Sequence, residues 1–206
     1  MRLFEELPEN SVILALGPSL EGKKELLYEY LANCFRKNEP VLFITTDNPA
    51  ENIKIDLVKN KIFYGGKSVK FIDCYARQAN ESVPDTEDTK RVPGPLALNE
   101  MSIAIAEAER DIYAKNPKHR VIFNSLSTLL LYSNTQAIAR FLQVLIARVK
   151  NSGGSGFFSI EKNMHDEQVI TTMVHLMDGV VEFEKREGKI MAKTKGFGSE
   201  SWETLG

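Results

Sequence analysis

Two glycines and a lysine near the amino terminus have the spacing of a phosphate-binding loop. The segment Gly17-Pro-Ser-Leu-Glu-Gly-Lys23 follows a short apolar run and precedes a stretch with helical periodicity. It matches the pattern G-x-x-x-x-G-K, in which backbone N–H groups and a helix amino terminus surround phosphate oxygens while the lysine reaches the outer phosphates. An ordinary strand-to-helix turn with a glycine at each end is the alternative. On the first interpretation, phosphates contact Gly17, Pro18, Ser19, Gly22 and Lys23.

The elements around this loop are those of an α/β protein with a mostly parallel sheet. Short apolar runs alternate with longer stretches of helical period. The predicted strands are residues 12–16, 41–45, 69–73, 121–124 and 156–160, and they are apolar on consecutive positions, as strands covered on both faces should be. The predicted helices are residues 23–36, a segment starting at Pro49, and residues 99–115, 135–150 and 165–177. Residues 180–183 and 189–195 are expected to form a terminal hairpin.

Two segments show neither the apolar pattern of a strand nor that of a helix. Residues 76–95 contain three of the eight prolines and several acids, which predicts a long acidic surface loop or a disordered segment. The glycine-rich tail, residues 196–206, contains Trp202, and it packs either back on the body or on a neighbour. The length of 206 residues favours a single domain that spans residues 1–206.

Composition excludes several classes of function. The chain has 26 basic and 28 acidic residues, so no overall positive field attracts nucleic acid or an anionic membrane. Its apolar runs are far shorter than the roughly 20 residues of a membrane-spanning helix, and its first residues do not form a secretory signal. Cys34 and Cys74 lie in apolar stretches and are expected to be buried thiols, while the three histidines have no metal-ligand spacing. These features predict a cytoplasmic protein without a metal cage.

Several separate stretches together resemble one known family. They are Gly17 to Lys23; Val41-Leu-Phe-Ile-Thr-Thr-Asp-Asn-Pro49; Arg120-Val-Ile-Phe-Asn-Ser-Leu-Ser127; His165-Asp166 with Asp178-Gly-Val180; and Lys193-Thr-Lys-Gly196. In that order they resemble the Walker A loop, the second strand with its acidic turn, the Walker B strand, the segment after the fifth strand, and the last hairpin strand of KaiC-like domains. The chain is similar over almost its whole length to this branch of the RecA superfamily, archaeal and bacterial P-loop ATPases that often assemble into rings.

The resemblance implies a RecA-like P-loop NTPase fold with three layers. With the predicted strands numbered along the chain, it implies the sheet order 3-2-4-1-5, extended beside the fifth strand by the antiparallel hairpin. It also implies ATP or ADP as the ligand, and a homo-oligomeric ring or a protein partner as the assembly. Lys24, Asn124, Lys193 and Lys195 then join the loop residues as candidate contacts of the nucleotide.

The loop departs from the family pattern at three positions. Lys24 stands where a serine or threonine hydroxyl would bind magnesium, and lysine has no acceptor for a cation. Leu20 and Glu21 replace small residues, so a carboxylate lies among amides that would bind phosphate. At about 4 Å and an effective dielectric of about 20, the repulsion between two such charges is about 4 kcal/mol. Glu21 therefore weakens phosphate binding unless it turns away.

Three more departures affect the metal and the transferred phosphate. Asn124 replaces the aspartate that organises magnesium. Asp47-Asn48 replaces an acidic pair, which leaves Asp47 as the single candidate catalytic base. Lys195 replaces an arginine that would reach the phosphate of a neighbouring subunit, and lysine is not equivalent to arginine at a bidentate site. The substitutions predict weak or absent ATPase activity and argue against magnesium as a cofactor.

Three functions follow from these residues. The first is a catalytically impaired ATPase homologue that acts as a nucleotide-binding or regulatory module. The second is an active ATPase with an atypical site, in which Asp47 positions water, Lys24 partly replaces the metal's charge, and Lys193 or Lys195 acts on the next subunit. The third is a structural subunit that completes a ring. The missing hydroxyl after Lys23 and the missing carboxylate at Asn124 favour the first over the second.

Overall fold

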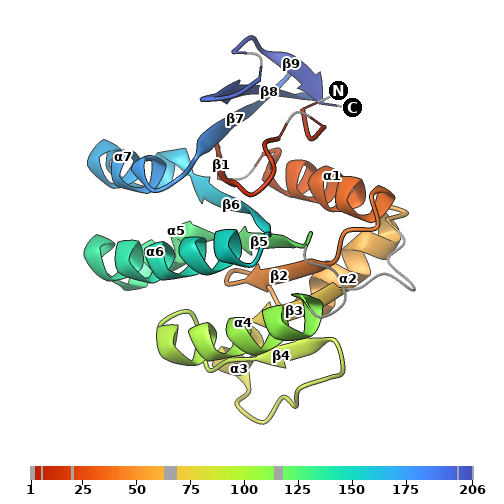
Figure 1. Cartoon of the computed structure of the whole chain (residues 1–206), viewed down its shortest axis with the longest axis vertical. Coiled ribbons are helices and arrows are strands. Elements are labelled where there is room, and N and C mark those ends of the chain that lie inside the picture. Colours follow the sequence, from red (N-terminus) through yellow and green to blue (C-terminus); the bar gives the residue numbers. More distant parts are fainter. Residues whose placement is uncertain are drawn as a thin grey trace.

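A central sheet with helices on both faces makes up the computed structural model, which describes residues 3–5, 7–19, 21–62, 69–113, 118–198 and 200–205 (Figure 1). Its strands are β1 (Val12–Gly17), β2 (Val41–Thr45), β3 (Val69–Asp73), β4 (Thr89–Arg91), β5 (Arg120–Asn124), β6 (Ser155–Glu161), β7 (Gly179–Arg186), β8 (Lys189–Lys195) and β9 (Glu203–Leu205). Its helices are α1 (Lys23–Arg36), α2 (Ala50–Lys59), α3 (Ala76–Ala79), α4 (Leu98–Tyr113), α5 (Leu126–Tyr132), α6 (Thr135–Asn151) and α7 (Glu167–His175), with a 3₁₀ turn at Lys162–Met164. The five predicted strands and the terminal hairpin are confirmed.

Two apolar cores lie on the two faces of the sheet. Helices α1 and α2 cover one face, and α4, α5, α6 and α7 cover the other (Figure 1). Every residue of β1 and β2 is buried, which explains why these strands are apolar on consecutive positions. Cys34 and Cys74 are buried free thiols, as predicted. In the part of the chain that the structure describes, no helix is long and apolar enough to cross a membrane.

The strand order differs from the predicted one at the centre of the sheet. Among the described residues the order is β4-β3-β2-β5-β6-β1-β7-β8-β9, and neighbouring strands from β4 to β7 are parallel. The predicted order 3-2-4-1-5 is therefore wrong: the fifth predicted strand, β6, lies between β5 and β1, and the hairpin lies beside β1. Two hydrogen bonds between Asp178 and Val12 fix β7 there. Asp178 Oδ2 accepts from the Val12 N–H at 2.8 Å, and the Asp178 N–H donates to the Val12 carbonyl.

Residues 76–95 do not form one long loop. They contain α3 and β4, and β4 extends the sheet by pairing in parallel with β3. Charged side chains hold the segment: the Asp73 carboxylate accepts from the backbone of Ala50, Tyr75 and Ala76, and the buried Arg91 guanidinium donates to Glu51. The segment has no apolar period because polar groups hold it, and periodicity therefore could not reveal it.

The carboxyl-terminal tail packs on the body. Strand β9 pairs with β8, and the Trp202 ring lies beneath the cations of Arg186 and Lys193, which are 4.8 and 4.7 Å from its centroid. Cation–π contacts of this length are attractive. Of the two arrangements that the sequence left open, the described residues of the tail adopt the first.

A buried glutamate lies between α4 and α6. Glu109 is 4% exposed, and neither of its carboxylate oxygens has a hydrogen-bond partner among the described residues. The Arg148 guanidinium is 3.9 Å away and donates instead to the Ser102 carbonyl. Burial raises the pKa of Glu109 to about 7, and Arg148 offsets this only in part.

This burial predicts a stability that falls with pH. The folded-state pKa of Glu109 lies above its unfolded value, so its protonated form stabilises the fold fully below about pH 4.5, and that stability is lost as the pH rises to about 7. Glu109→Gln should therefore be more stable than wild type by roughly 3 kcal/mol at pH 8 and similar to it near pH 4. Urea unfolding at both pH values measures this difference. Glu107→Gln, on the exposed side of α4, is the control, and an equal gain at both pH values would contradict the prediction.

Candidate functional site

Lys23 lies between two carboxylates at the carboxyl edge of the sheet. It is the first residue of α1, and its Nζ donates to Asp47 Oδ2 at 2.8 Å and to Glu161 Oε1 at 2.5 Å. Asp47 follows β2, and Glu161 is the last residue of β6. The side chains of Lys23 and Glu161 are 16% and 6% exposed, so this ion pair is largely removed from water.

Asn124 orients the carboxylate of Asp47. The Asn124 amide Nδ2 donates to Asp47 Oδ1 at 2.9 Å, and its Oδ1 accepts from the Ser159 hydroxyl at 3.1 Å. Both Asn124 and Ser159 are buried. The chain Ser159–Asn124–Asp47 therefore fixes the carboxylate that is the candidate catalytic base.

Two serines at the start of α5 hold Glu161. The Ser125 hydroxyl donates to Glu161 Oε2 at 2.7 Å, and the Ser127 hydroxyl accepts from the Glu161 N–H at 2.9 Å. Ser125 is also the N-cap of α5, because its hydroxyl accepts from the Ser127 N–H. The start of α5 thus holds both the side chain and the backbone of Glu161.

Both partners of the buried pair are charged at neutral pH. Burial disfavours the Lys23 ammonium, but Asp47 and Glu161 outweigh burial and raise the pKa of Lys23. Burial likewise opposes the Glu161 carboxylate, whereas Lys23 and the two serines lower the pKa of Glu161. With two carboxylates and one ammonium, the three charged side chains sum to a net charge of −1.

Both loop glycines lie against the terminal hairpin. A Cβ at Gly17 would clash with the Phe183 ring, and a Cβ at Gly22 would lie 2.8 Å from Ile190 Cδ1. Gly22 has φ +87° and is the N-cap of α1, and no side chain caps the helix there. The first N–H groups of α1 thus have no side-chain acceptor at the cap position, as a phosphate site requires.

The other loop residues have different surroundings. Pro18 and Ser19 are half-buried, Glu21 is exposed, and the predicted position Leu20 lies outside the described residues. Pro18 also lines a cavity of about 260 Å³ between the loop and β7, and Trp202 lies on the same cavity. Because Glu21 is exposed, its carboxylate is not buried among the loop amides.

A cavity of about 250 Å³ opens beside Lys23. Its lining residues are Lys23, Lys24, Leu27, Tyr28, Phe43, Asp47, Asn48, Ile53 and Asn124. Sites that enclose a drug-sized ligand typically have volumes of about 300 to 1,000 Å³. This cavity is therefore large enough for a phosphate group and smaller than a whole nucleotide.

The structure brings together only part of the predicted site. Lys23, Asp47 and Asn124 meet, as their places at the strand ends predict. Lys24 turns toward α2, where its Nζ donates to Asp56 at 2.5 Å. Lys193 and Lys195 are 3.0 and 2.7 Å from the Glu182 carboxylate of the same hairpin.

Sequence analysis missed Glu161. Its signal was a single carboxylate directly after the predicted strand 156–160, at the edge where ligands bind in open α/β sheets. In the predicted strand order, the strand that leads to Glu161 lies beyond β1, away from Asp47. Glu161 was therefore not expected near the site. The true order places β6 between the strands that carry Asn124 and Gly17.

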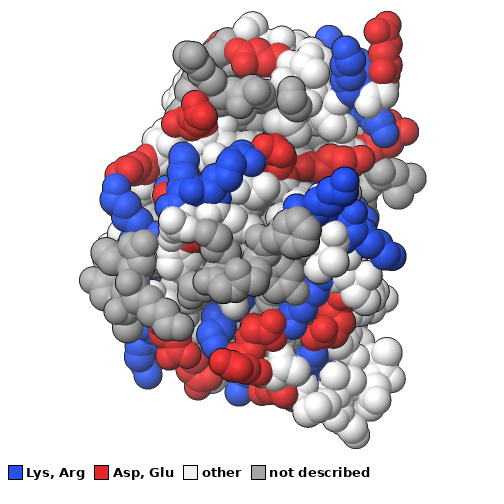
Figure 2. All heavy atoms as spheres, turned by 90° about the vertical axis from the view of Figure 1, so that its right-hand side faces the viewer, with Lys and Arg blue, Asp and Glu red and all other residues white. Residues whose placement is uncertain are grey.

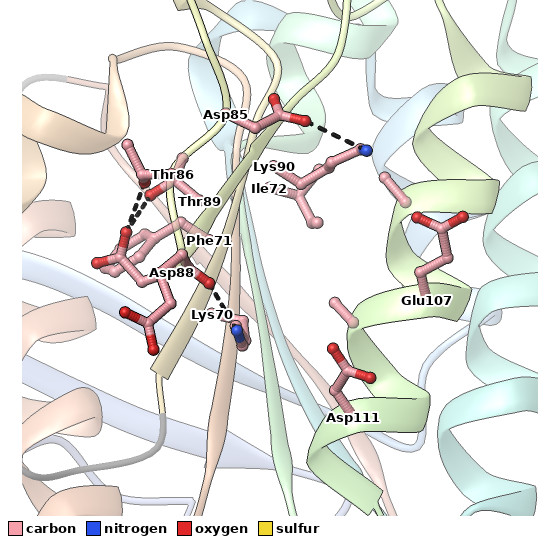
Figure 3. Close-up of a pocket in the computed structure, with 13 residues that line it drawn as sticks. Lys70, Phe71, Ile72, Asp85, Thr86, Asp88, Thr89, Lys90, Glu107 and Asp111 are labelled. Carbon is pink, nitrogen blue, oxygen red and sulfur yellow. Dashed lines mark hydrogen bonds and ion pairs between the residues drawn. The ribbon is translucent and has the colours of Figure 1, made fainter.

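Other surfaces suit phosphate less well. A cavity beside β4 has a volume of about 260 Å³. In Figure 3, Glu107 and Asp111 on α4 lie across this cavity from Asp85 and Lys90. Its acids would repel phosphate. Over the face that carries α1 and α2, basic and acidic side chains are interspersed (Figure 2). Within the described ranges, no group of three or more His, Cys, Asp or Glu side chains is arranged to hold a metal ion.

The fold is similar to that of KaiC-like domains, which confirms the predicted fold class. A KaiC-like protein from the hyperthermophilic archaeon Pyrococcus horikoshii has the same fold: the match covers 96% of this chain and 86% of that chain, with a TM-score of 0.67 and 14% identity. A UPF0273 protein of Aeropyrum pernix is 26% identical over 197 residues, which is 90% of this chain and 74% of the relative. The chain belongs to the family of unknown function DUF7504, whose model matches residues 10–183.

The contact between the loop and the hairpin predicts a coupled pair of substitutions. Gly22→Ala should cost about 2 to 3 kcal/mol of stability, because it adds strain at positive φ and a clash with Ile190 Cδ1. Ile190→Val removes that atom, so in its background Gly22→Ala should cost only about 1 kcal/mol. Urea unfolding of the four proteins without nucleotide measures the coupling, and strictly additive losses would show that the hairpin does not impose the glycine.

Proposed function

We propose that this protein binds ATP or ADP through the Gly17–Lys23 loop and acts as a nucleotide-binding or regulatory protein with weak or absent ATPase activity. One observation carries the proposal: Lys23 places a buried ammonium at the start of α1, where Gly22 leaves the helix end without a side-chain cap. The positive end of the helix dipole and the ammonium attract the same phosphate oxygens. The KaiC-like fold supports a nucleotide as the source of those phosphates.

Weak hydrolysis is supported by what surrounds Lys23. The residue after it, Lys24, offers no hydroxyl and is paired with Asp56. Asn124 is neutral, so the end of β5 supplies no carboxylate for a cation. Magnesium bound to a nucleotide would therefore receive fewer protein ligands than a P-loop site normally gives.

The active-ATPase alternative rests on Asp47. Its carboxylate is oriented by Asn124, as that of a base that positions water should be. Against it, Lys193 and Lys195 pair with Glu182 in their own hairpin, so either lysine would have to leave this carboxylate to act on a neighbouring subunit. The impaired module is the better supported function, and assembly into a homo-oligomeric ring or with a protein partner is part of this proposal.

Removal of the Lys23 ammonium tests the proposal directly. Lys23→Ala should weaken equilibrium binding of a labelled ATP analogue about 10- to 100-fold, because a charged hydrogen bond to phosphate contributes roughly 1.5 to 3 kcal/mol. Lys54→Ala is the matched control: Lys54 is also largely buried between carboxylates, those of Glu51 and Asp88, but it does not line the cavity beside Lys23. Equal affinities of wild type and Lys23→Ala would refute the proposed site.

Restoring the metal ligands tests the reason for weak hydrolysis. The double variant Lys24→Thr with Asn124→Asp adds a hydroxyl and a carboxylate, so we expect tighter ATP binding in magnesium than in a chelator, and faster phosphate release than wild type. Binding isotherms in both buffers and a phosphate-release assay measure this. If wild type already binds ATP in a magnesium-dependent way and hydrolyses it as fast as the variant, these two residues are not the cause.

A further inference from the structure

We infer that Glu161 is a built-in counter-anion that holds Lys23 while the site is empty and competes with nucleotide phosphate for this ammonium. The inference rests on the proposed function and assigns a regulatory role within the same site. Glu161 acts through Lys23, so it is a positioning residue.

The geometry fixes Glu161 more firmly than its partner Asp47. The Glu161 side chain is 6% exposed; one oxygen accepts from Lys23, the other from Ser125, and its backbone N–H donates to Ser127. The Asp47 side chain is 27% exposed and follows the end of β2. Asp47 lines the cavity beside Lys23 and Glu161 does not, so a phosphate that enters this cavity approaches the ammonium from the side of Asp47.

Charge explains the competition. The Lys23 ammonium has three donors, and the two carboxylates take two of them, so a phosphate oxygen can accept the third. That oxygen then lies within a few ångströms of a carboxylate that cannot move away, in surroundings where water screens poorly. Glu161 therefore lowers the affinity for phosphate and balances the Lys23 charge in the ligand-free protein.

A structural role of Glu161 predicts something different. If Glu161 only tied β6 to α5 through the serines, a glutamine of the same shape would remove the carboxylate charge without changing the affinity for phosphate. If the charge matters, Glu161→Gln and Glu161→Asp must differ, because only the second variant keeps the anion. The comparison thus separates charge from shape.

The experiment measures ATP-analogue binding and the titration of Lys23 in the ligand-free protein. Glu161→Gln should bind the analogue at least tenfold more tightly than wild type, and the pKa of Lys23, followed by NMR of the lysine side chain, should fall. Glu161→Asp should stay within about threefold of wild type. Glu39→Gln is the matched control, because Glu39 is also largely buried in an ion pair, with Arg120, away from Lys23.

The outcomes distinguish this inference from the proposed function. If wild type binds the analogue and Glu161→Gln does not bind it more tightly, the inference is overturned. If neither protein binds, the proposed function fails, and the titration still decides whether Glu161 holds the Lys23 ammonium. An unchanged pKa of Lys23 in Glu161→Gln overturns the inference. If the glutamine variant unfolds, a Glu161→Asp variant that binds the analogue within about threefold of wild type supports Glu161 as the fixed anion, and a loss of binding in Glu161→Asp contradicts it.

Discussion

The ion pair between Lys23 and Glu161 depends on the order of the central strands. A largely buried ammonium needs carboxylates close by, because the desolvation of an unpaired charge costs several kcal/mol. Those carboxylates come from the ends of β2 and β6, and they meet Lys23 only because β6 runs between β5 and β1. The starts of α1 and α5 adjoin this pair, since Lys23 opens the first helix and Ser125 caps the second.

The glycine pattern has a structural explanation that does not involve phosphate. A Cβ at Gly17 would clash with the Phe183 ring and a Cβ at Gly22 with Ile190 Cδ1, so the hairpin crowds both positions. The motif alone therefore does not decide between a turn and a phosphate loop. The argument for phosphate comes from the third member of the pattern, Lys23, and from the uncapped helix end beside it. The sequence predicted a lysine at a helix amino terminus, because Lys23 directly follows a glycine and opens a stretch of helical period.

Most of the sheet could be predicted because buried parallel strands are apolar on consecutive positions, as residues 12–16 and 41–45 are. The strand order could not be predicted, because hydrogen bonds of Asp178 with Val12, between residues far apart in the chain, hold β7 beside β1. Strand β4 was not predicted, because charged groups such as Arg91 hold it and its sequence has no apolar period. Of the site, Lys23, Asp47 and Asn124 were predicted from their places at element ends, whereas Glu161 could be recognised only once its strand had been placed.

The balance of charge at the site changes once Glu161 is included. Asn124 leaves the end of β5 without a carboxylate, but the adjacent strand supplies one, so the edge of the sheet still carries two acids near Lys23. The position of the second acid matters more than its presence. Each Glu161 oxygen already accepts a hydrogen bond, one from Lys23 and one from Ser125, so in the proposed site this carboxylate pairs with the lysine and is not assigned to magnesium. Under the proposed function, phosphate binding and hydrolysis therefore depend on different residues, the first on Lys23 and the second on a metal ligand that Asn124 does not provide.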